Sequence, residues 1–264
     1  MTTVIVGGGV MGEAILGGAL EKGVLRPGEV IVVEVVAERR DYLVSRYGVN
    51  VAAAADDVLH EATLVLLAVK PQEFAHLSGR LAPGAVLMSI MAGVSIAALS
   101  SHFSHERVIR VMPNTPAAVN AGMSVWTATP TVDDDQRAVA RALLGAIGRE
   151  LYVDDEAKLD MATALSGSGP AYVFLFIEAL VEAGVGIGLT RPQAEEMTLQ
   201  TLYGSALYAR ESEQSAADLR ARVTSPAGTT AAGLLELERG GFRAAVAECV
   251  RAAHERSREL GGSR

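Results

Sequence analysis

The chain has 264 residues, half of them hydrophobic, and a formal net charge of −8 at pH 7. This length allows one large domain or two ordinary ones, and the negative charge argues against a nucleic acid or an anionic membrane as a partner. The scarcity of aromatic residues, at 5%, favours helices packed on a parallel sheet over an all-β sandwich. We see neither a signal peptide nor an apolar run of transmembrane length, and therefore expect a cytoplasmic protein with no membrane partner.

The chain opens with a short apolar strand, a glycine-rich turn and a helix. The strand TVIV at residues 3–6 is followed by GGGVMG, which places a G-x-G-x-x-G pattern at Gly7, Gly9 and Gly12. Between a strand and a helix this pattern is typical of dinucleotide binding, because the glycines permit a tight turn and a close approach to a pyrophosphate. The free N–H groups at the start of the helix then bind the phosphates. The alternative is a glycine-rich turn without a ligand.

An acidic residue ends the second expected strand, residues 29–35 (EVIVVEV). Glu34 lies at its carboxyl end, where a carboxylate accepts hydrogen bonds from the ribose hydroxyls of the adenosine half of a dinucleotide. A carboxylate also repels a 2′-phosphate, and basic residues come only at Arg39 and Arg40. The cofactor is thus NADPH or NADH, and Glu34 favours acceptance of NADH. The alternative is an ordinary solvent-facing Glu at a strand end.

The alternation of strands with helices continues to about residue 153 and predicts a doubly wound parallel sheet. Further strands are expected at 47–52, 63–70, 84–93 and 106–117, with a last one near 151–153, and helices at 55–62 and from about 133. Ligands of such sheets lie beyond the carboxyl ends of the strands, so Lys70, at one of these ends, is expected near the cofactor, the alternative being a simple boundary residue. We predict a dinucleotide-binding domain at 1–153 and a helical domain at 154–264.

The second half has only helical patterns. Ser168 is expected to cap a helix whose first turn holds Pro170, and the body of this helix, about 171–183, is apolar nearly all round. A helix of this kind is buried on every side, which indicates a subunit interface as well as a core. Histidines lie outside all of the motifs, so no metal site is expected.

Near the end of the chain, a helix begins with small hydroxylated residues and no charge. Ser225-Pro226 sets up a turn, and the helix begins at Gly228-Thr229-Thr230. Unpaired N–H groups at such a helix start bind anions, and the two Thr hydroxyls add hydrogen bonds. A small carboxylate fits here without Lys or Arg. Plain capping of the helix without a ligand is equally compatible with these residues.

Five motifs occur in a set order, namely GGGVMG, AVKP (68–71), MPNTPA (112–117), SGSGPAY (166–172) and VTSPAGTTAAGL (223–234). Together they resemble the pyrroline-5-carboxylate reductase family, over nearly the whole chain. The resemblance implies a Rossmann domain followed by a helical domain that interlocks as a homodimer, often within a larger ring such as a decamer. It also implies that each active site lies between the nucleotide domain of one subunit and helices of its partner.

The resemblance implies a reaction and the residues that carry it. Hydride passes from NAD(P)H to the C=N carbon of 1-pyrroline-5-carboxylate, an imino acid, giving L-proline. The implied cofactor contacts are Val6, Gly7, Gly8, Gly9, Val10, Met11, Gly12, Glu34, Ala68, Val69, Lys70, Pro71, Met91 and Ala92. The implied substrate contacts are Ser225, Gly228, Thr229, Thr230 and, near the product, Glu156. The hydroxyl of Thr230 points at the ring nitrogen and is the implied catalytic group.

The chain departs from the family pattern at three positions. Where family members often have SPGGT, this chain has Ala227 in place of the first Gly. Ala is strained there if the turn needs a positive φ and is tolerated if φ is negative. Members that favour NADPH often have small polar or basic residues at the end of the second strand, where this chain has Glu34-Val35. Many members carry Asn near the position of Ala55, where it helps to hold the adenosine end. Both differences leave the choice of cofactor open.

Two other functions fit the same two-domain plan. One is another imine or β-hydroxyacid reductase, although a hydroxyacid enzyme would need a Lys as acid and base in the helical domain, and only Lys158 lies beyond residue 150. The other is a protein that binds a dinucleotide without turnover.

Overall fold

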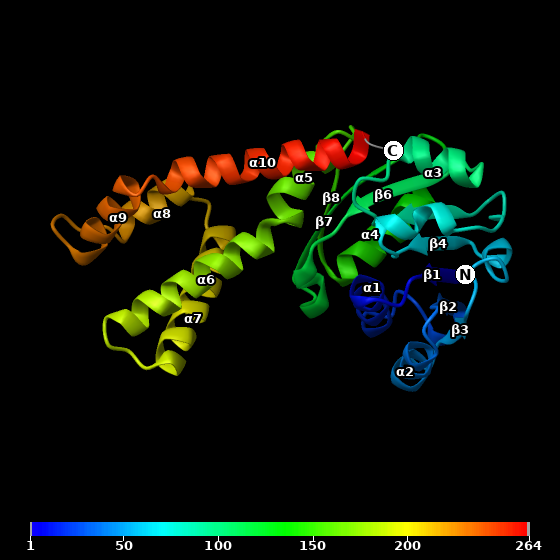
Figure 1. Cartoon of the computed structure of the whole chain (residues 1–264), viewed down its shortest axis with the longest axis horizontal. Helices are drawn as coiled ribbons and strands as arrows, with labels where there is room; N and C mark the ends of the chain where they lie inside the picture. The colour runs from blue at the N-terminus through cyan, green and yellow to red at the C-terminus, as the bar shows by residue number, and fades with distance from the viewer. Residues whose placement is uncertain (1, 263–264) are drawn as a thin grey trace. The chain divides into compact units, whose positions relative to one another are not determined.

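The computed structural model describes residues 2–262 and divides into two compact units. One holds residues 2–170 together with 253–262, and the other holds residues 171–252. Figure 1 shows the helices and strands of the chain. The domain boundary expected at residue 153 stays a prediction.

The first unit is built on an eight-stranded sheet of order β3-β2-β1-β4-β5-β6-β7-β8. The adjacent pairs are parallel except β6 with β7. The strands are β1 (Thr3–Val6), β2 (Val30–Val33), β3 (Asn50–Ala52), β4 (Leu64–Leu67), β5 (Val86–Ser89), β6 (Val108–Met112), β7 (Gly122–Ala128) and β8 (Gly148–Tyr152). From β1, the chain builds the sheet first toward β2 and β3 and then, from β4 onward, on the other side of β1. This reversal between β1 and β4 creates the crevice where doubly wound sheets bind ligands.

One strand departs from the expected parallel sheet. β7, which the sequence reading did not predict, runs antiparallel to β6, with Val111 opposite Trp126. A parallel return needs a crossover of a dozen or more residues, whereas residues 113–121 hold only a 3₁₀ turn (Thr115–Val119). The link is therefore too short for any direction other than antiparallel.

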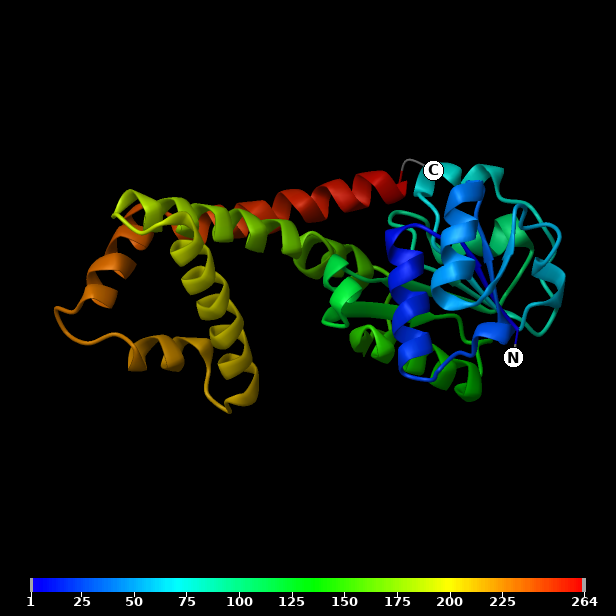
Figure 2. The same ribbon diagram turned by 90° about the horizontal axis from the view of Figure 1, so that it is seen from below.

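Helices cover both faces of the sheet (Figures 1 and 2). The helices α1 (Val10–Glu21), α2 (Ala37–Tyr47) and α4 (Asp134–Ala146) pack in one apolar cluster with side chains from one face of the sheet. The opposite face packs with α3 (Ile96–Phe103) and short 3₁₀ turns. Two separate cores, one on each face, are what the near-continuous apolar runs of buried parallel strands predict.

The prediction of a helix at residues 55–62 is wrong. Only a 3₁₀ turn, Leu59–Glu61, forms there, and a second one, Pro71–His76, follows β4. The side chain of Asp56 accepts a hydrogen bond from Ser78 Oγ at 2.9 Å. A helix of two turns is marginal by itself, and an Asp that bonds into a loop favours irregular structure.

The capping role expected for Ser168 is also wrong. A continuous helical path leads from α5 (Lys158–Ala162) through a π-helical turn (Thr163–Gly167) into α6 (Gly169–Gly186), and Ser168 has helical backbone angles inside it. Pro170 has no N–H to donate to the carbonyl of Ser166 four residues earlier. The side-chain amide of Asn114 donates to that carbonyl instead, at 3.0 Å. A donor from another segment thus lets the helix run through its proline.

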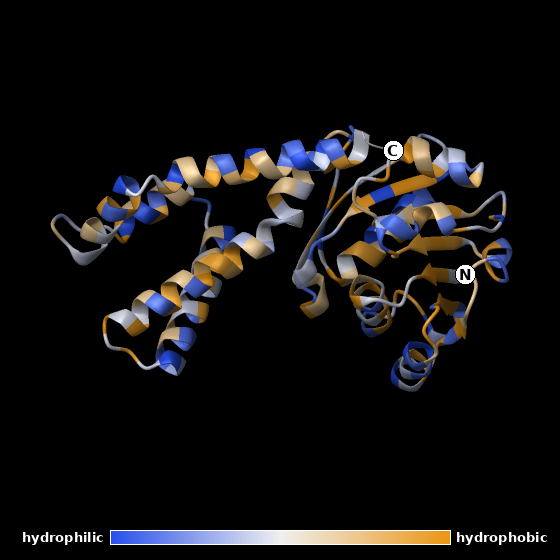
Figure 3. Cartoon of the chain, in the orientation of Figure 1, coloured by the Kyte–Doolittle hydropathy of each residue, from blue (hydrophilic) through white to orange (hydrophobic). Residues whose placement is uncertain are grey.

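The second unit contains most of α6 together with α7 (Arg191–Glu211), α8 (Ala216–Arg222), α9 (Thr229–Arg239) and the first half of α10 (Phe242–Gly262). α6 carries many apolar residues (Figure 3), and Phe174 and Leu175 are 56% and 67% exposed. The expectation that this helix is buried on every side is therefore not met within one chain. By length and composition the path Lys158–Gly186 is able to cross a membrane, which the sequence reading overlooked.

Candidate active site

The glycine loop joins β1 to α1 in the geometry that a dinucleotide needs. Gly7 has a positive φ of 106°, and a Cβ there would lie 2.7 Å from the carbonyl oxygen of Ala68. A Cβ on Gly12 would lie 2.0 Å from the carbonyl oxygen of Gly7. A Cβ on Gly9, in contrast, would meet no atom of the described chain within 4 Å. The loop is thus closed toward the protein and open toward solvent at the position where a pyrophosphate approaches.

A cleft of about 440 Å³ opens beside this loop. Four of the expected cofactor residues line it, namely Val6, Gly7, Glu34 and Val69. Its other lining residues include Ala53–Asp56 and residues of the 3₁₀ turn after β4, and of these the sequence analysis named only Ala55. Ala55 lies here, so the small side chain at this position faces the cleft.

Glu34 lies directly after β2 and folds back onto the glycine loop. Its carboxylate accepts the backbone N–H of Gly8 at 3.1 Å and that of Val36 at 3.0 Å. Each carboxylate oxygen accepts more than one hydrogen bond, so Glu34 can still accept from ribose hydroxyls. The two backbone bonds hold its negative charge at the mouth of this cleft.

Arg39, which the sequence analysis named only as a basic residue, holds the carbonyl group of Gly8, and Glu13 in turn holds Arg39. Arg39 Nε donates to the carbonyl oxygen of Gly8 at 2.7 Å, and its Nη2 pairs with Glu13 in the first turn of α1. Tyr47 donates to Glu13 at 2.9 Å, as does Tyr42. Burial by itself raises the pKa of Glu13, but the bonds from Arg39 and the two tyrosines outweigh it, so its pKa lies below the usual value. Only the close spacing of Arg39 to Glu34 in the sequence could have signalled this network.

The expected contacts after β4 and β5 lie at the same carboxyl edge of the sheet. Ala68 donates its N–H to the carbonyl of Val6 at 2.8 Å and packs against the glycine loop. Lys70 is exposed and precedes the 3₁₀ turn that Pro71 opens. After β5, Met91 is buried and Ala92 is exposed. The loop, the acidic strand end and the open edge together fit a nicotinamide dinucleotide.

The turn before α9 lies in the second unit. Gly228 is the N-cap of α9, and no side chain of the described residues caps the helix there. The N–H of Gly228 donates to the carbonyl of Ser225 at 3.1 Å, which closes the turn. The first N–H groups of a helix have no partner within it, so those of Thr229 and Thr230 are available to an anion.

Ala227 has a φ of 56°, in the left-handed region. The sequence left open whether φ at this position is positive or negative. It is positive, so Ala227 is strained. A residue with a Cβ is costly there and Gly is not, which gives a physical reason for the Gly that family members often carry.

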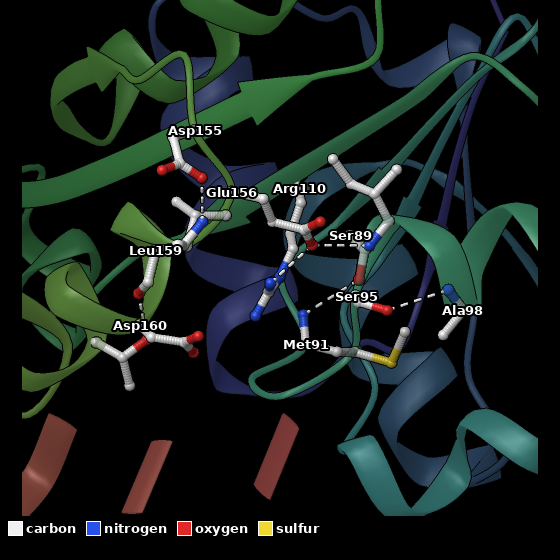
Figure 4. A network of polar contacts seen from close by, with 12 residues as sticks. Ser89, Met91, Ser95, Ala98, Arg110, Asp155, Glu156, Leu159 and Asp160 are labelled. Atoms are coloured by element: carbon white, nitrogen blue, oxygen red, sulfur yellow. Dashed lines mark hydrogen bonds and ion pairs between the residues drawn. The ribbon is translucent and has the colours of Figure 1, made fainter. Parts of the chain in front are cut away.

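Glu156 precedes α5 and has partners within the first unit (Figure 4). Its Oε1 accepts the N–H of Ile96 at 2.8 Å and a hydrogen bond from Arg110 Nη1 at 2.7 Å. Arg110 was missed by the sequence reading, although a lone charge inside the apolar strand VIRVM could have signalled it. The expected contact of Glu156 with the product stays a prediction. Within the described residues, no group of three His, Cys, Asp or Glu is placed to hold a metal.

A doubly wound sheet with a glycine loop and an acidic second strand end defines a nicotinamide-dependent oxidoreductase. The family model "NADP oxidoreductase coenzyme F420-dependent" matches residues 2–93, and the model "Pyrroline-5-carboxylate reductase dimerisation" matches residues 156–260. The chain belongs to the pyrroline-5-carboxylate reductase family.

Relatives support this over nearly the full length. A pyrroline-5-carboxylate reductase of Synechocystis is 45% identical over 97% of both chains. The structure of a pyrroline-5-carboxylate reductase from Coxiella burnetii has a TM-score of 0.89 and 35% identity, covering 98% of each chain. That of Plasmodium falciparum pyrroline carboxylate reductase, with NADP bound, has a TM-score of 0.86 and 29% identity, covering 99% of this chain and 98% of that one.

The activity follows from this membership. The chain transfers hydride from NAD(P)H to the C=N bond of 1-pyrroline-5-carboxylate and gives L-proline, the last step of proline biosynthesis. Its second half is a dimerisation domain, so the chain associates with itself.

Proposed function

We propose that the two halves of the reaction are divided between the glycine loop and the turn before α9. The cofactor residues are Val6–Gly12, Glu34, Ala68–Pro71, Met91 and Ala92, which follow the carboxyl edge of the sheet. The observation that carries this half is the glycine loop, closed toward Ala68 and open at Gly9. When bound, the reduced nicotinamide supplies the hydride.

Substrate binding is proposed at the turn of Ser225 to Thr230. The N–H groups of Thr229 and Thr230 hold the substrate carboxylate, supported by the absence of a side-chain cap at Gly228 among the described residues. The hydroxyl of Thr230 hydrogen-bonds the ring nitrogen and helps to relay a proton to it. Seating the carboxylate in this way orients the imine carbon, and positioning of this kind contributes on the order of 7 kcal/mol of barrier lowering at best.

A strong general acid is not required by this chemistry. A cyclic imine is able to take a proton from water before hydride transfer. Thr hydroxyls and backbone N–H groups therefore suffice at the proposed seat, and no His or Lys is needed beside Thr230. This distinguishes the proposal from a β-hydroxyacid reductase, since Lys158 forms an exposed pair with Asp154 at 2.5 Å.

We further propose that a partner subunit completes each active site, in a dimer or in a ring such as a decamer. The exposed apolar side chains of α6, including Phe174 and Leu175, support an extensive interface between copies. Burial in such an interface accounts for the apolar composition of Lys158–Gly186 without a membrane. We therefore propose a cytoplasmic location.

Mixing two inactive variants tests the shared site. Gly12→Val disables the glycine loop, since even a Cβ there collides with Gly7, and Thr230→Ala disables the proposed seat. If each site uses the loop of one subunit and the turn of its partner, a mixed dimer regains one intact site. Coexpression in equal amounts then yields about a quarter of wild-type turnover. Activity no higher than that of either variant alone would place both halves of the site in one subunit.

For the cofactor, we propose that NADH is accepted, and preferred over NADPH. The support is the carboxylate of Glu34, held at the adenosine cleft by the N–H groups of Gly8 and Val36. Initial rates with 1-pyrroline-5-carboxylate and each cofactor test this, and a higher kcat/KM for NADPH would contradict it.

A further inference from the structure

We infer that Glu156 is a positioning residue, which fixes the turn of residues 90–95 so that Ala92 meets the nicotinamide end of the cofactor. The inference rests on the proposed course of the cofactor along the carboxyl edge of the sheet. It gives Glu156 a function separate from a contact with the product.

The turn between β5 and α3 is anchored on both sides of Ala92. Met91 and Val94 are buried in the core on the α3 side of the sheet, and the N–H of Met91 donates to Ser89 Oγ at 3.2 Å. Gly93 has a φ of 71°, and a Cβ there would lie 3.4 Å from the backbone of Leu260. Ala92 is the exposed residue between these anchors. The turn therefore presents Ala92 toward solvent at the sheet edge.

Glu156 holds the end of this turn. Ile96 is the first residue of α3, and its N–H has no acceptor within the helix, as for every helix start. Ser95 Oγ accepts a hydrogen bond from the N–H of Ala98 at 3.1 Å, and Glu156 Oε1 accepts one from the N–H of Ile96 at 2.8 Å (Figure 4). A negative charge is also favoured at a helix N-terminus. The carboxylate thus connects the segment that enters α5 to the segment that leaves the turn.

Arg110 fixes the carboxylate in turn. The Arg110 side chain is 8% exposed, and its Nη1 donates to the same Oε1 atom at 2.7 Å. In the sheet, Arg110 on β6 lies opposite Ser89 on β5. A buried guanidinium without a counter-charge is costly, so Arg110 and Glu156 hold each other in place. Both line a cleft of about 280 Å³ with Gly93 and Ser95. Asp160 and Arg258 also line this cleft, and Asp160 accepts a hydrogen bond from Ser257 at 2.8 Å.

The strand order assigns this turn to one end of the cofactor. Glu34, the adenosine side, follows β2, whereas Ala92 follows β5 on the other side of β1 and β4. A dinucleotide crosses a doubly wound sheet at the reversal between these halves. Displacement of Ala92 therefore affects the nicotinamide end and spares the adenosine end.

The experiment compares ligands with and without the nicotinamide ring. Wild type, Glu156→Gln and the matched control Asp154→Asn, an exposed carboxylate two residues away, are titrated with NADH, NADPH and ADP-ribose. KM values are measured for cofactor and for 1-pyrroline-5-carboxylate. We expect Glu156→Gln to weaken binding of the reduced cofactors about tenfold, because the amide oxygen can still accept but no longer carries the charge that pairs with the buried Arg110. ADP-ribose binding and the KM for the imino acid stay within twofold, and Asp154→Asn matches wild type.

Three results would overturn the inference. A higher KM for the imino acid with unchanged cofactor binding would make Glu156 a substrate contact. A parallel loss of ADP-ribose binding would indicate general disorder of the domain, and unchanged binding of all ligands would remove the role altogether. Arg110→Lys serves as a second variant, with a smaller loss expected in the same selective pattern. Wild type that binds NADH no more tightly than ADP-ribose would instead refute the proposed course of the cofactor itself.

Discussion

Replacing Ala227 by Gly should stabilise the protein, because Ala227 occupies the left-handed region with a φ of 56°. A left-handed residue with a Cβ costs about 1–2 kcal/mol, and the greater freedom of Gly in the unfolded chain takes back about 0.4–1 kcal/mol. The expected net gain is about 0.5–1 kcal/mol, which corresponds to a rise of roughly 1–3 °C in Tm for a chain of this size. Thermal unfolding followed by circular dichroism measures the change.

The neighbouring glycine provides a matched control of opposite sign. Gly228 has a φ of −79°, but a Cβ there would lie 2.3 Å from Ser225 Oγ. Gly228→Ala should therefore lower Tm, at a cost of about 1–2 kcal/mol for overpacking, and Ser225→Ala in the same chain should recover most of the loss. A Tm of Ala227→Gly at or below that of wild type would refute the strain argument. Failure of Ser225→Ala to rescue Gly228→Ala would refute the steric one.

Four other changes have expected outcomes. Thr230→Ala should lower kcat at least tenfold and leave cofactor affinity within twofold, and an unchanged kcat would remove Thr230 from the mechanism. Glu34→Ser should raise the ratio of kcat/KM for NADPH to that for NADH, and no change would mean that Glu34 does not face the ribose. Glu13→Gln should lower Tm near pH 7, because it removes the ionised carboxylate that Arg39 and the tyrosines stabilise. The folded pKa of Glu13 lies below its ordinary 4.5, so the difference in Tm between wild type and variant should vanish as the pH falls below 4.5 and through the folded pKa. Asn114→Ala should cost about 1–3 kcal/mol, and less in a Pro170→Ala background, where an N–H returns to the Ser166 carbonyl; equal losses in both backgrounds would contradict this compensation.

The apolar strands and the glycine loop were predictable because their signals are local. Val30–Val33 is a continuous apolar run, and Gly7, Gly9 and Gly12 follow a short apolar strand at the spacing of the dinucleotide motif. The position of Glu34 at a strand end followed from the same run. The α9 start was also recognisable, since small hydroxylated residues after Pro226 mark a helix N-terminus. Each of these features depends on a few neighbouring residues, whose backbone preferences persist whatever surrounds them.

Contacts between distant segments could not be predicted in this way. The position of β7 between β6 and β8 appears only in the assembled sheet. The bond from Asn114 to Ser166 repairs a defect that Pro170 creates, so neither residue signals it alone. The pairing of Arg110 with Glu156 likewise appears only when β6 and the start of α5 come together.

The sequence by itself determined the apolar strands β1, β2, β4, β5 and β6, the dinucleotide loop and, through five ordered motifs, the family. Tertiary structure alone decided the left-handed backbone of Ala227, the bonds of Glu34 to the glycine loop and the partners of Glu156. The physical reason is that composition and spacing report on local backbone preference and burial. A hydrogen-bond partner is chosen by the docking of segments, which brings a donor to an acceptor that has none nearby.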